Sequence, residues 1–218
     1  GLTRKMSYQA THDPLTGLIN RREFERRLDE DMDSAHAEES VHMLFYMDLD
    51  RFKAVNDSCG HLAGDNMLRE VANLIKEQVR DSDFVGRLGG DEFGALLIGC
   101  PIDKARQIAT DICNAIADYR FVWKDKIFNI GISIGLVEIS HVSGTLQDVM
   151  SAADSACYVA KQQGRGKVHV SSARDEAVAR ERGDIQWLRQ LQSALHEDRF
   201  SLAIQPILAM AGGVESGP

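Results

Sequence analysis

The chain is short of cysteine, proline and aromatic residues, and these shortages exclude several classes of protein. Its four cysteines, Cys59, Cys100, Cys113 and Cys157, are widely spaced and form no CxxC pair. This argues against a disulfide framework and against a zinc site. Four prolines and 6% aromatic residues form no low-complexity tract, and the two tryptophans offer no stacking platform for single-stranded nucleic acid.

Long apolar runs and a secretory signal are also missing. The longest apolar runs are far shorter than the ~20 residues that a membrane-spanning helix needs, and no signal-like segment opens the chain. We therefore expect a cytoplasmic protein with reduced thiols that makes no membrane contact through this fragment. Because the chain begins with glycine rather than methionine, we expect a longer parent, which missing upstream domains could attach to a membrane.

Basic residues are in the minority. The sequence has 33 acidic and 25 basic residues, and its formal net charge is −8. This balance argues against DNA or RNA as a partner, because nucleic-acid binders usually present a basic face. A polyanionic small molecule would need local lysine, arginine or metal ions to bind against the overall charge.

The spacing of apolar residues predicts a mixture of strands and helices. Strand-like runs cover residues 41–49, 84–88, 92–98, 121–123, 127–139 and 167–170. Helical spacing covers residues 68–79, 105–116 and 146–160, and Asn20 is a candidate N-cap for a helix that buries Phe24 and Leu28. Because these elements do not alternate strictly, the sequence favours an α+β fold in which helices pack on a central sheet.

Two acidic clusters follow predicted strands. Asp48 and Asp50 lie two residues apart at the end of an apolar strand, so they share one face, and Asp91 and Glu92 follow two glycines in a predicted hairpin turn. Taken alone, either cluster could be a set of solvated acids. Together they suit Mg²⁺, which takes one or two carboxylates and fills its other positions with water and substrate phosphates.

Two basic residues follow near the end of the domain. Lys161 and Arg165 lie four residues apart, and the sequence predicts that they share one face at the end of a helix. They could complement the helix dipole or bind the outer phosphates of a nucleoside triphosphate. Beside the two acidic clusters, the second interpretation favours phosphoryl-type chemistry.

These clusters belong to longer motifs. Residues 87–93 (RLGGDEF) contain the signature of the GGDEF family, the diguanylate cyclases. Residues 13–21 resemble the family's opening motif, residues 48–57 and 60–65 resemble its first active-site segment, and residues 153–165 resemble its closing helix. The resemblance covers roughly residues 10–170 and implies a palm-like domain with a central mixed, mostly antiparallel sheet flanked by helices.

The resemblance also implies a role for individual residues. Asp48, Asp91 and the Leu49 carbonyl would hold Mg²⁺ or Mn²⁺, with Glu92 as a second-metal ligand or proton acceptor. Residues that would bind the substrate GTP fall into three sets: Asn56 and Asp65 for guanine; the backbone of Arg51 and Phe52 with Lys53, Lys161 and Arg165 for phosphate; and Gly89 and Gly90 for the space beside the ribose and α-phosphate.

The reaction that the family carries out joins two GTP molecules into cyclic di-GMP and releases two pyrophosphates. Each subunit would hold one GTP, so catalysis would need a homodimer. Arg80 and Asp83 fit an RxxD pattern placed just before the signature, as in family members that bind their own product. This resemblance implies inhibition by cyclic di-GMP.

The ends of the chain suggest a larger arrangement. We expect residues 1–10 to be the end of an upstream signalling helix or linker, 11–172 to be the cyclase domain, and 173–218 to be a linker helix and the truncated start of an EAL phosphodiesterase domain. A helix that packs back on the domain is the alternative for the last segment. Two alternative functions stay open: a regulatory GTP-binding module that controls the EAL domain with little turnover, and a non-catalytic cyclic di-GMP receptor.

Overall fold

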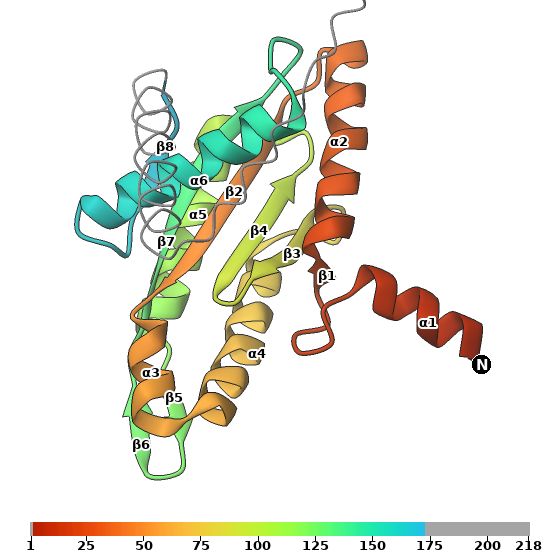
Figure 1. The fold of residues 1–218 in the computed structure, drawn as a ribbon. Coiled ribbons are helices and arrows are strands. Elements are labelled where there is room, and N and C mark those ends of the chain that lie inside the picture. Colours follow the sequence, from red (N-terminus) through yellow and green to blue (C-terminus); the bar gives the residue numbers. More distant parts are fainter. Residues whose placement is uncertain (1, 173–218) are drawn as a thin grey trace, which may run out of the picture. The chain divides into compact units, whose positions relative to one another are not determined.

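A six-stranded sheet forms the centre of the domain (Figure 1). The computed structural model describes residues 2–172, so the predicted linker helix and EAL start lie outside the described residues. The strand order is β1-β3-β4-β2-β7-β8, with antiparallel inner pairs and parallel pairs at both edges. The strands are β1 (Ile19–Asn20), β2 (His42–Asp50), β3 (Phe84–Gly89), β4 (Glu92–Leu97), β7 (Gly131–Ile139) and β8 (Val168–Val170).

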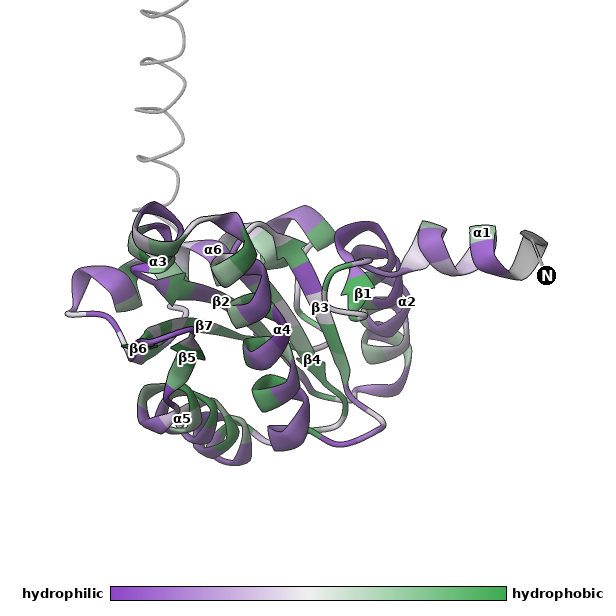
Figure 2. Cartoon of the chain, turned by 90° about the horizontal axis from the view of Figure 1, so that it is seen from below, coloured by the Kyte–Doolittle hydropathy of each residue, from purple (hydrophilic) through white to green (hydrophobic). Residues whose placement is uncertain are grey.

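Helices cover both faces of this sheet. The described helices are α1 (Leu2–Thr11), α2 (Arg21–Glu38), α3 (Phe52–Cys59), α4 (His61–Gln78), α5 (Ile102–Asp118) and α6 (Leu146–Gln162), of which α2, α4, α5 and α6 pack on the sheet. One core cluster joins α2 and α6 to the face that carries Leu44 and Tyr46, and another joins α4 and α5 to the face that carries Met43 and Phe45. Apolar residues accordingly concentrate in the sheet and on the inner sides of the helices (Figure 2). No helix in the described part of the chain is long and apolar enough to cross a membrane.

The predicted α+β fold with a central mixed, mostly antiparallel sheet is confirmed. Three local predictions were wrong or incomplete. The single strand expected over residues 127–139 is two strands, since β6 (Lys126–Phe128) pairs with β5 (Phe121–Trp123) in a separate hairpin and β7 begins at Gly131. Val79 has extended backbone and follows α4 instead of belonging to it. Helix α3 was not predicted, because only Val55 is buried in its eight residues.

Two glycines let the helices approach the sheet closely. Gly94 and Gly135 stand on either side of Tyr46 in the ladders of β4 and β7. A Cβ atom on Gly135 would lie 2.2 Å from the carbonyl oxygen of Ala153 in α6, and one on Gly94 would lie 2.9 Å from Phe24 in α2. A Cβ atom does not approach other atoms this closely, so both helices depend on the absence of a side chain at these positions.

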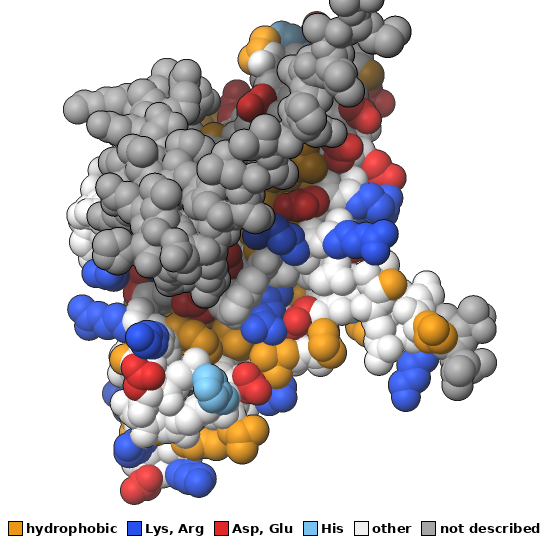
Figure 3. All heavy atoms as spheres, in the orientation of Figure 1, with side chains coloured by type: hydrophobic (Ala, Val, Ile, Leu, Met, Phe, Trp, Pro, Cys, Tyr) orange, Lys and Arg blue, Asp and Glu red, His pale blue; other side chains and the backbone are white. Residues whose placement is uncertain are grey.

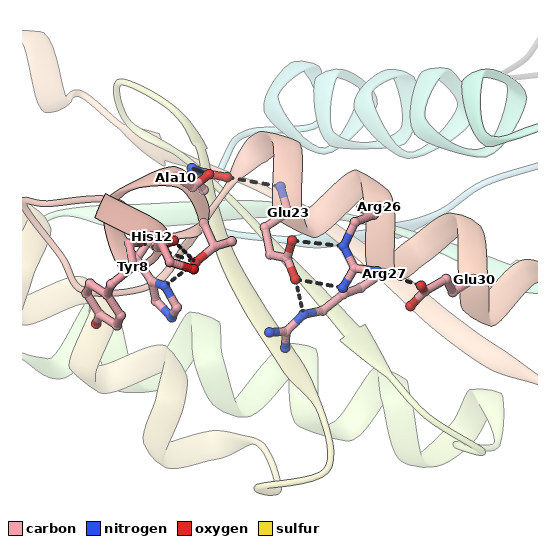
Figure 4. Close-up of polar contacts among 10 residues, drawn as sticks. Tyr8, Ala10, His12, Glu23, Arg26, Arg27 and Glu30 are labelled. Atoms are coloured by element: carbon pink, nitrogen blue, oxygen red, sulfur yellow. Dashed lines mark hydrogen bonds and ion pairs between the residues drawn. The ribbon is translucent and has the colours of Figure 1, made fainter. Parts of the chain in front are cut away.

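The junction between α1 and α2 is held by a helix cap. As predicted, Asn20 caps α2, and its side chain accepts a hydrogen bond from the Glu23 N–H. The amide nitrogen of the same side chain donates to the Ala10 carbonyl at 3.0 Å, which ties the end of α1 to the start of α2. The Glu23 carboxylate is free to pair with Arg26 and Arg27, each at 2.9 Å (Figure 4).

Charge is distributed unevenly along α2. Its first two turns carry four arginines and its second half carries most of its acids, and Figure 3 shows this division on the surface. The arrangement opposes the helix dipole, which favours acidic side chains at the start and basic ones at the end. Glu23 is therefore the acidic residue of the first turn that offsets the arginines around it.

We predict that the Glu23 carboxylate makes the free energy of unfolding of the domain depend on pH in the acidic range. Hydrogen bonds from Arg26 and Arg27 lower the pKa of Glu23 from 4.5 to about 2, so its contribution is complete above pH 4.5 and is lost as the pH falls toward 2. Glu23→Gln should lower the free energy of unfolding by about 1–3 kcal/mol at pH 7, and the difference from the wild type should shrink at pH 3. Urea denaturation at both pH values measures this.

Glu30→Gln is the matched control, because Glu30 is an exposed acid of the same helix whose carboxylate pairs with Arg26. It should change stability by less than about 0.5 kcal/mol. A loss for Glu23→Gln that is equally large at pH 3 and pH 7 would contradict the assignment.

Candidate active site

The end of β2 and the turn between β3 and β4 lie side by side. Asp48, near the end of β2, stands opposite Glu92 in the antiparallel ladder. The Leu49 N–H donates to the Asp91 carbonyl oxygen at 3.1 Å, which ties the turn to the strand. The two acidic clusters of the sequence therefore meet at one edge of the sheet.

Arg87 holds this turn in shape. Its guanidinium donates to the carbonyl oxygens of Gly89 at 3.2 Å and Gly90 at 2.9 Å, and also to Asp13 Oδ1 at 3.1 Å. The register of β3 and β4 shifts between Arg87 and Gly89, so Leu88 bulges out of the ladder. Sequence reasoning missed Arg87, although a charged residue inside an apolar strand just before a glycine turn was an available signal.

Negative charge is concentrated at Asp48. Burial, and then the charge of Asp91, raises the pKa of Asp48 to about 7, while the Lys161 ammonium lowers it. Lys161 Nζ lies 3.1 Å from Asp48 Oδ1, in an ion pair. That oxygen is buried, and the ammonium of Lys161 is the cation that faces it. Asp48 is therefore under-compensated, because one cation stands against three carboxylates, its own and those of Asp91 and Glu92.

These residues fit a divalent cation that is shared with a ligand. Among residues 2–172, no three His, Cys, Asp or Glu side chains form a complete metal-binding group. The site offers instead the carboxylates of Asp48 and Asp91 and the backbone carbonyl of Leu49. Mg²⁺ is commonly held in this way, by one or two carboxylates with water and substrate phosphates in its remaining positions.

Buried Tyr46 fixes one oxygen of the third carboxylate. Its hydroxyl donates to Glu92 Oε2 at 2.8 Å. Burial, together with this hydrogen bond, raises the pKa of Tyr46 well above its ordinary value, so the hydroxyl keeps the proton that it donates. Sequence reasoning also missed Tyr46. It lies two residues before Asp48 on β2, and a strand places such residues on one face.

The predicted guanine-binding residues lie where α3 meets α4. Asn56 Oδ1 is buried and has no hydrogen-bond partner within the described residues. A Cβ on Gly64 would lie 1.9 Å from that oxygen, so the glycine makes room for the amide. Asp65 follows in α4 and is partly exposed. An unpaired buried acceptor is costly unless a ligand donates to it.

The predicted phosphate-binding residues surround the start of α3 and the end of α6. Arg51 has left-handed backbone (φ 64°) and precedes the first turn of α3, which begins at Phe52, while Lys53 is exposed. Lys161 lies in the last turn of α6. The prediction that Arg165 shares a helical face with Lys161 was wrong, because α6 ends at Gln162 and Arg165 lies in a left-handed turn at φ 62°.

The RxxD residues form a closed turn. Asp83 accepts hydrogen bonds from the backbone and side chain of Arg80 and from the Ile98 N–H, and its side chain is fully enclosed. The Arg80 side chain is 58% exposed. It lines a cavity of about 320 Å³ together with His12, Arg27 and Lys76. Arg80 is thus available to an anionic ligand, whereas Asp83 supports the turn.

Comparison with known proteins gives one family. The model described as "Diguanylate cyclase, GGDEF domain" matches residues 10–167. The probable diguanylate cyclase DgcE of Escherichia coli is 45% identical over 85% of this chain. The bifunctional diguanylate cyclase/cyclic di-GMP phosphodiesterase MucR of Pseudomonas aeruginosa is 36% identical over 98% of it. The chain spans 17% of the length of DgcE and 31% of the length of MucR.

Solved structures agree with this result. The GGDEF domain of TpbB from Pseudomonas aeruginosa is 34% identical, with a TM-score of 0.73 over 78% of this chain and 99% of that one. The coiled coil and GGDEF domain of DgcB from Caulobacter crescentus, in complex with c-di-GMP, is 27% identical. Its TM-score is 0.74 over 78% of this chain and 90% of that one.

We predict that the acidic site binds a divalent cation in the absence of nucleotide. At pH 8, Mg²⁺ or Mn²⁺ at ten times its dissociation constant should stabilise the domain by about 1.4 kcal/mol, which raises the melting temperature by about 3–6 °C. Asp91→Asn should remove this shift. Asp125→Asn changes an exposed acid in the β5–β6 turn and should keep it. Equal shifts in both variants would mean that the cation binds elsewhere.

Proposed function

The chain belongs to the GGDEF family of diguanylate cyclases, and from this membership we propose that it condenses two GTP molecules into cyclic di-GMP and two pyrophosphates. The observation that carries the proposal is the gathering of Asp48, Asp91 and Glu92 beside a single lysine. Such an arrangement needs added positive charge, and a metal–triphosphate complex brings it together with the substrate.

Each group of residues has a part in substrate binding. Asn56 and Asp65 would recognise guanine, since an amide oxygen and a carboxylate accept hydrogen bonds from guanine N1 and N2. The backbone N–H groups of Arg51 and Phe52, at the start of α3, would bind phosphate oxygens. Lys53, Lys161 and Arg165 would add positive charge, and the open space at Gly90 leaves room for the ribose and α-phosphate.

The reaction would proceed by in-line displacement. The 3′-oxygen of one GTP attacks the α-phosphorus of the other, the bond to pyrophosphate breaks, and a second round closes the ring. Mg²⁺ or Mn²⁺, when bound to Asp48, Asp91 and the Leu49 carbonyl, would lower the pKa of the 3′-OH and neutralise the leaving group. Glu92 would bind a second metal or accept the 3′-OH proton. Tyr46 leaves Oε1 of that carboxylate for either role.

Two further features complete the proposal. The residues around one site would bind one GTP, so two chains would face each other as a homodimer, at least transiently. Most of the rate enhancement would come from positioning and charge.

Product inhibition would act through Arg80. The cavity that it lines also presents Arg27 and Lys76, which suits a ligand with two phosphates. Asp83 would hold Arg80 in place and would accept from guanine only if the turn opened.

The test of the proposed activity is turnover of GTP. Purified protein, freed of bound nucleotide, is incubated with GTP and Mg²⁺ at several protein concentrations, and cyclic di-GMP and pyrophosphate are measured. The rate should rise faster than linearly with protein concentration, because the active form is a dimer. Asp91→Asn should lower it by at least about 100-fold, the order of loss for a group that acts on the transition state.

Asp125→Asn is the control for this experiment and should leave the rate unchanged. GTP binding without product would overturn the cyclase proposal in favour of the regulatory module, provided that a dimerising leucine zipper in place of residues 1–8 does not restore turnover. Binding of cyclic di-GMP without binding of GTP would favour the non-catalytic receptor.

We also predict that Arg80→Ala weakens product inhibition. Loss of charge-assisted hydrogen bonds to phosphate should raise the half-inhibitory concentration of cyclic di-GMP by about tenfold or more. Initial rates at increasing cyclic di-GMP, each divided by the rate of the same variant without it, give this value. Arg69→Ala removes an exposed arginine of α4 outside the cavity and should leave inhibition intact. Unchanged inhibition in Arg80→Ala would place the regulatory site elsewhere.

A further inference from the structure

Asp50 has no part in the chemistry proposed above, although it lies two residues from Asp48 on the same strand. Only 3% of the residue is exposed. Its Oδ1 accepts from the Ser133 hydroxyl at 2.8 Å, and its Oδ2 accepts from the Gly166 N–H at 2.9 Å. Both oxygens of this carboxylate therefore accept hydrogen bonds from other groups of the chain.

The second of these bonds reaches the turn that carries Arg165. After α6 ends, Gly164, Arg165 and Gly166 all have positive φ, at 115°, 62° and 61°. Arginine adopts such a conformation only when its surroundings impose it. Hydrogen bonds within the turn come from the N–H of Gly164 to Lys161 and from the N–H of Arg165 to Ala160. These bonds tie the turn to the helix, and the bond from Gly166 to Asp50 ties it to the sheet.

The surroundings of Asp50 are built to hold it. Ser133 is fully buried on β7 and stands opposite Asp48 in the ladder, two rows from Asp50 and on the same face. Gly131, directly opposite Asp50, makes room for the carboxylate, since a Cβ there would lie 3.0 Å from Oδ2. Lys161 Nζ is 4.0 Å from Oδ1, so the charge of Asp50 is partly balanced.

We propose that Asp50 is a positioning residue that acts through Arg165. By accepting the Gly166 N–H, it fixes the left-handed turn and thereby the point from which the Arg165 side chain reaches the nucleotide phosphates. Ser133 in turn fixes Asp50. This assignment rests on the proposed function, because it takes Arg165 to bind phosphate. It gives the two carboxylates of residues 48–50 different roles. Asp48 faces the ligand, whereas Asp50 supports Arg165, which binds the ligand.

The test compares nucleotides that differ in phosphate number. Dissociation constants for GMP and GTP are measured by calorimetry in EDTA, where no metal supports turnover, and their ratio reports binding of the outer phosphates. Arg165→Ala should reduce the preference for GTP by about tenfold. Asp50→Ala should reduce it by a similar factor and leave the affinity for GMP unchanged. In the Arg165→Ala background, Asp50→Ala should have no further effect.

Asp50→Asn separates hydrogen bonding from charge. The asparagine oxygen can accept from Gly166, and its amide can donate to the rotatable Ser133 hydroxyl. The variant should therefore restore the preference for GTP to within about threefold of the wild type, which is well under 1.4 kcal/mol. If Asp50 acted as a metal ligand or only as the partner of Lys161, Asp50→Asn would be as damaging as Asp50→Ala.

Hydrogen exchange tests the clamp without reference to nucleotide. The peptide that covers residues 160–168 should exchange faster in Asp50→Ala than in Asp125→Ala, the matched control. If Asp50→Ala does not fold, Ser133→Ala is the substitute, because it removes one of the two hydrogen bonds to Asp50 and keeps the one from Gly166. It should also speed exchange of this peptide, but by a smaller factor.

The outcomes distinguish this inference from the proposed function. A normal preference for GTP in Arg165→Ala would refute the phosphate role of Arg165, and the positioning role would fall with it. A reduced preference in Arg165→Ala, together with normal preference and normal exchange in Asp50→Ala, would overturn the role of Asp50 alone. Additive losses in the double variant would also overturn it.

Discussion

Three carboxylates, those of Asp48, Asp91 and Glu92, gather where β2 ends, and the Lys161 ammonium pairs with the first of them. The surrounding structure is organised around this imbalance of charge. Burial of Asp48, and then the charges of Asp91 and Glu92 beside it, raise the pKa of Asp48 to about 7. Lys161 offsets part of the repulsion. The backbone carbonyls of the glycine turn are already occupied by Arg87. A further cation would offset this negative charge, and a ligand with several phosphates gains from the same cation.

The sheet brings these charges together through its register. Asp48 pairs with Glu92 on one side and with Ser133 on the other, so a one-residue slip would turn the acid to the opposite face. Two rows away, glycines flank Tyr46 and allow α2 and α6 to pack closely over that face. The tyrosine is buried as a result, and its hydroxyl reaches the carboxylate of Glu92. Packing by two helices thus sets the orientation of a polar group at the edge of the site.

Much of this could be predicted from the sequence, since period-two and helical spacing report burial directly. They located β2, the β3–β4 hairpin, α4, α5 and the cap of α2, and the literal signature located the acidic turn. Helix α3 escaped prediction because a single buried residue leaves no periodic pattern. The break between β6 and β7 escaped because both flanks are apolar. The enclosure of Asp83 depends in part on the Ile98 N–H, which apolar spacing does not encode. The departure of Arg165 from the helix follows the positive-φ glycines on either side of it, which four-residue spacing alone ignores.

Asp48 and Asp50 show why residue type and face do not suffice to assign a role. They are the same residue, two positions apart on one strand, with side chains on the same face. Asp48 has two acidic neighbours, Asp91 and Glu92, and its Oδ1 is paired with the ammonium of Lys161 at 3.1 Å. Asp50 has a hydroxyl and a backbone N–H in contact with its two oxygens. A carboxylate surrounded by donors is already satisfied and gains little from a ligand, whereas one surrounded by acids gains from any cation. Because the difference arises from β7 and the turn after α6, the roles of the two aspartates are set by segments some 80 and 115 residues away in the chain.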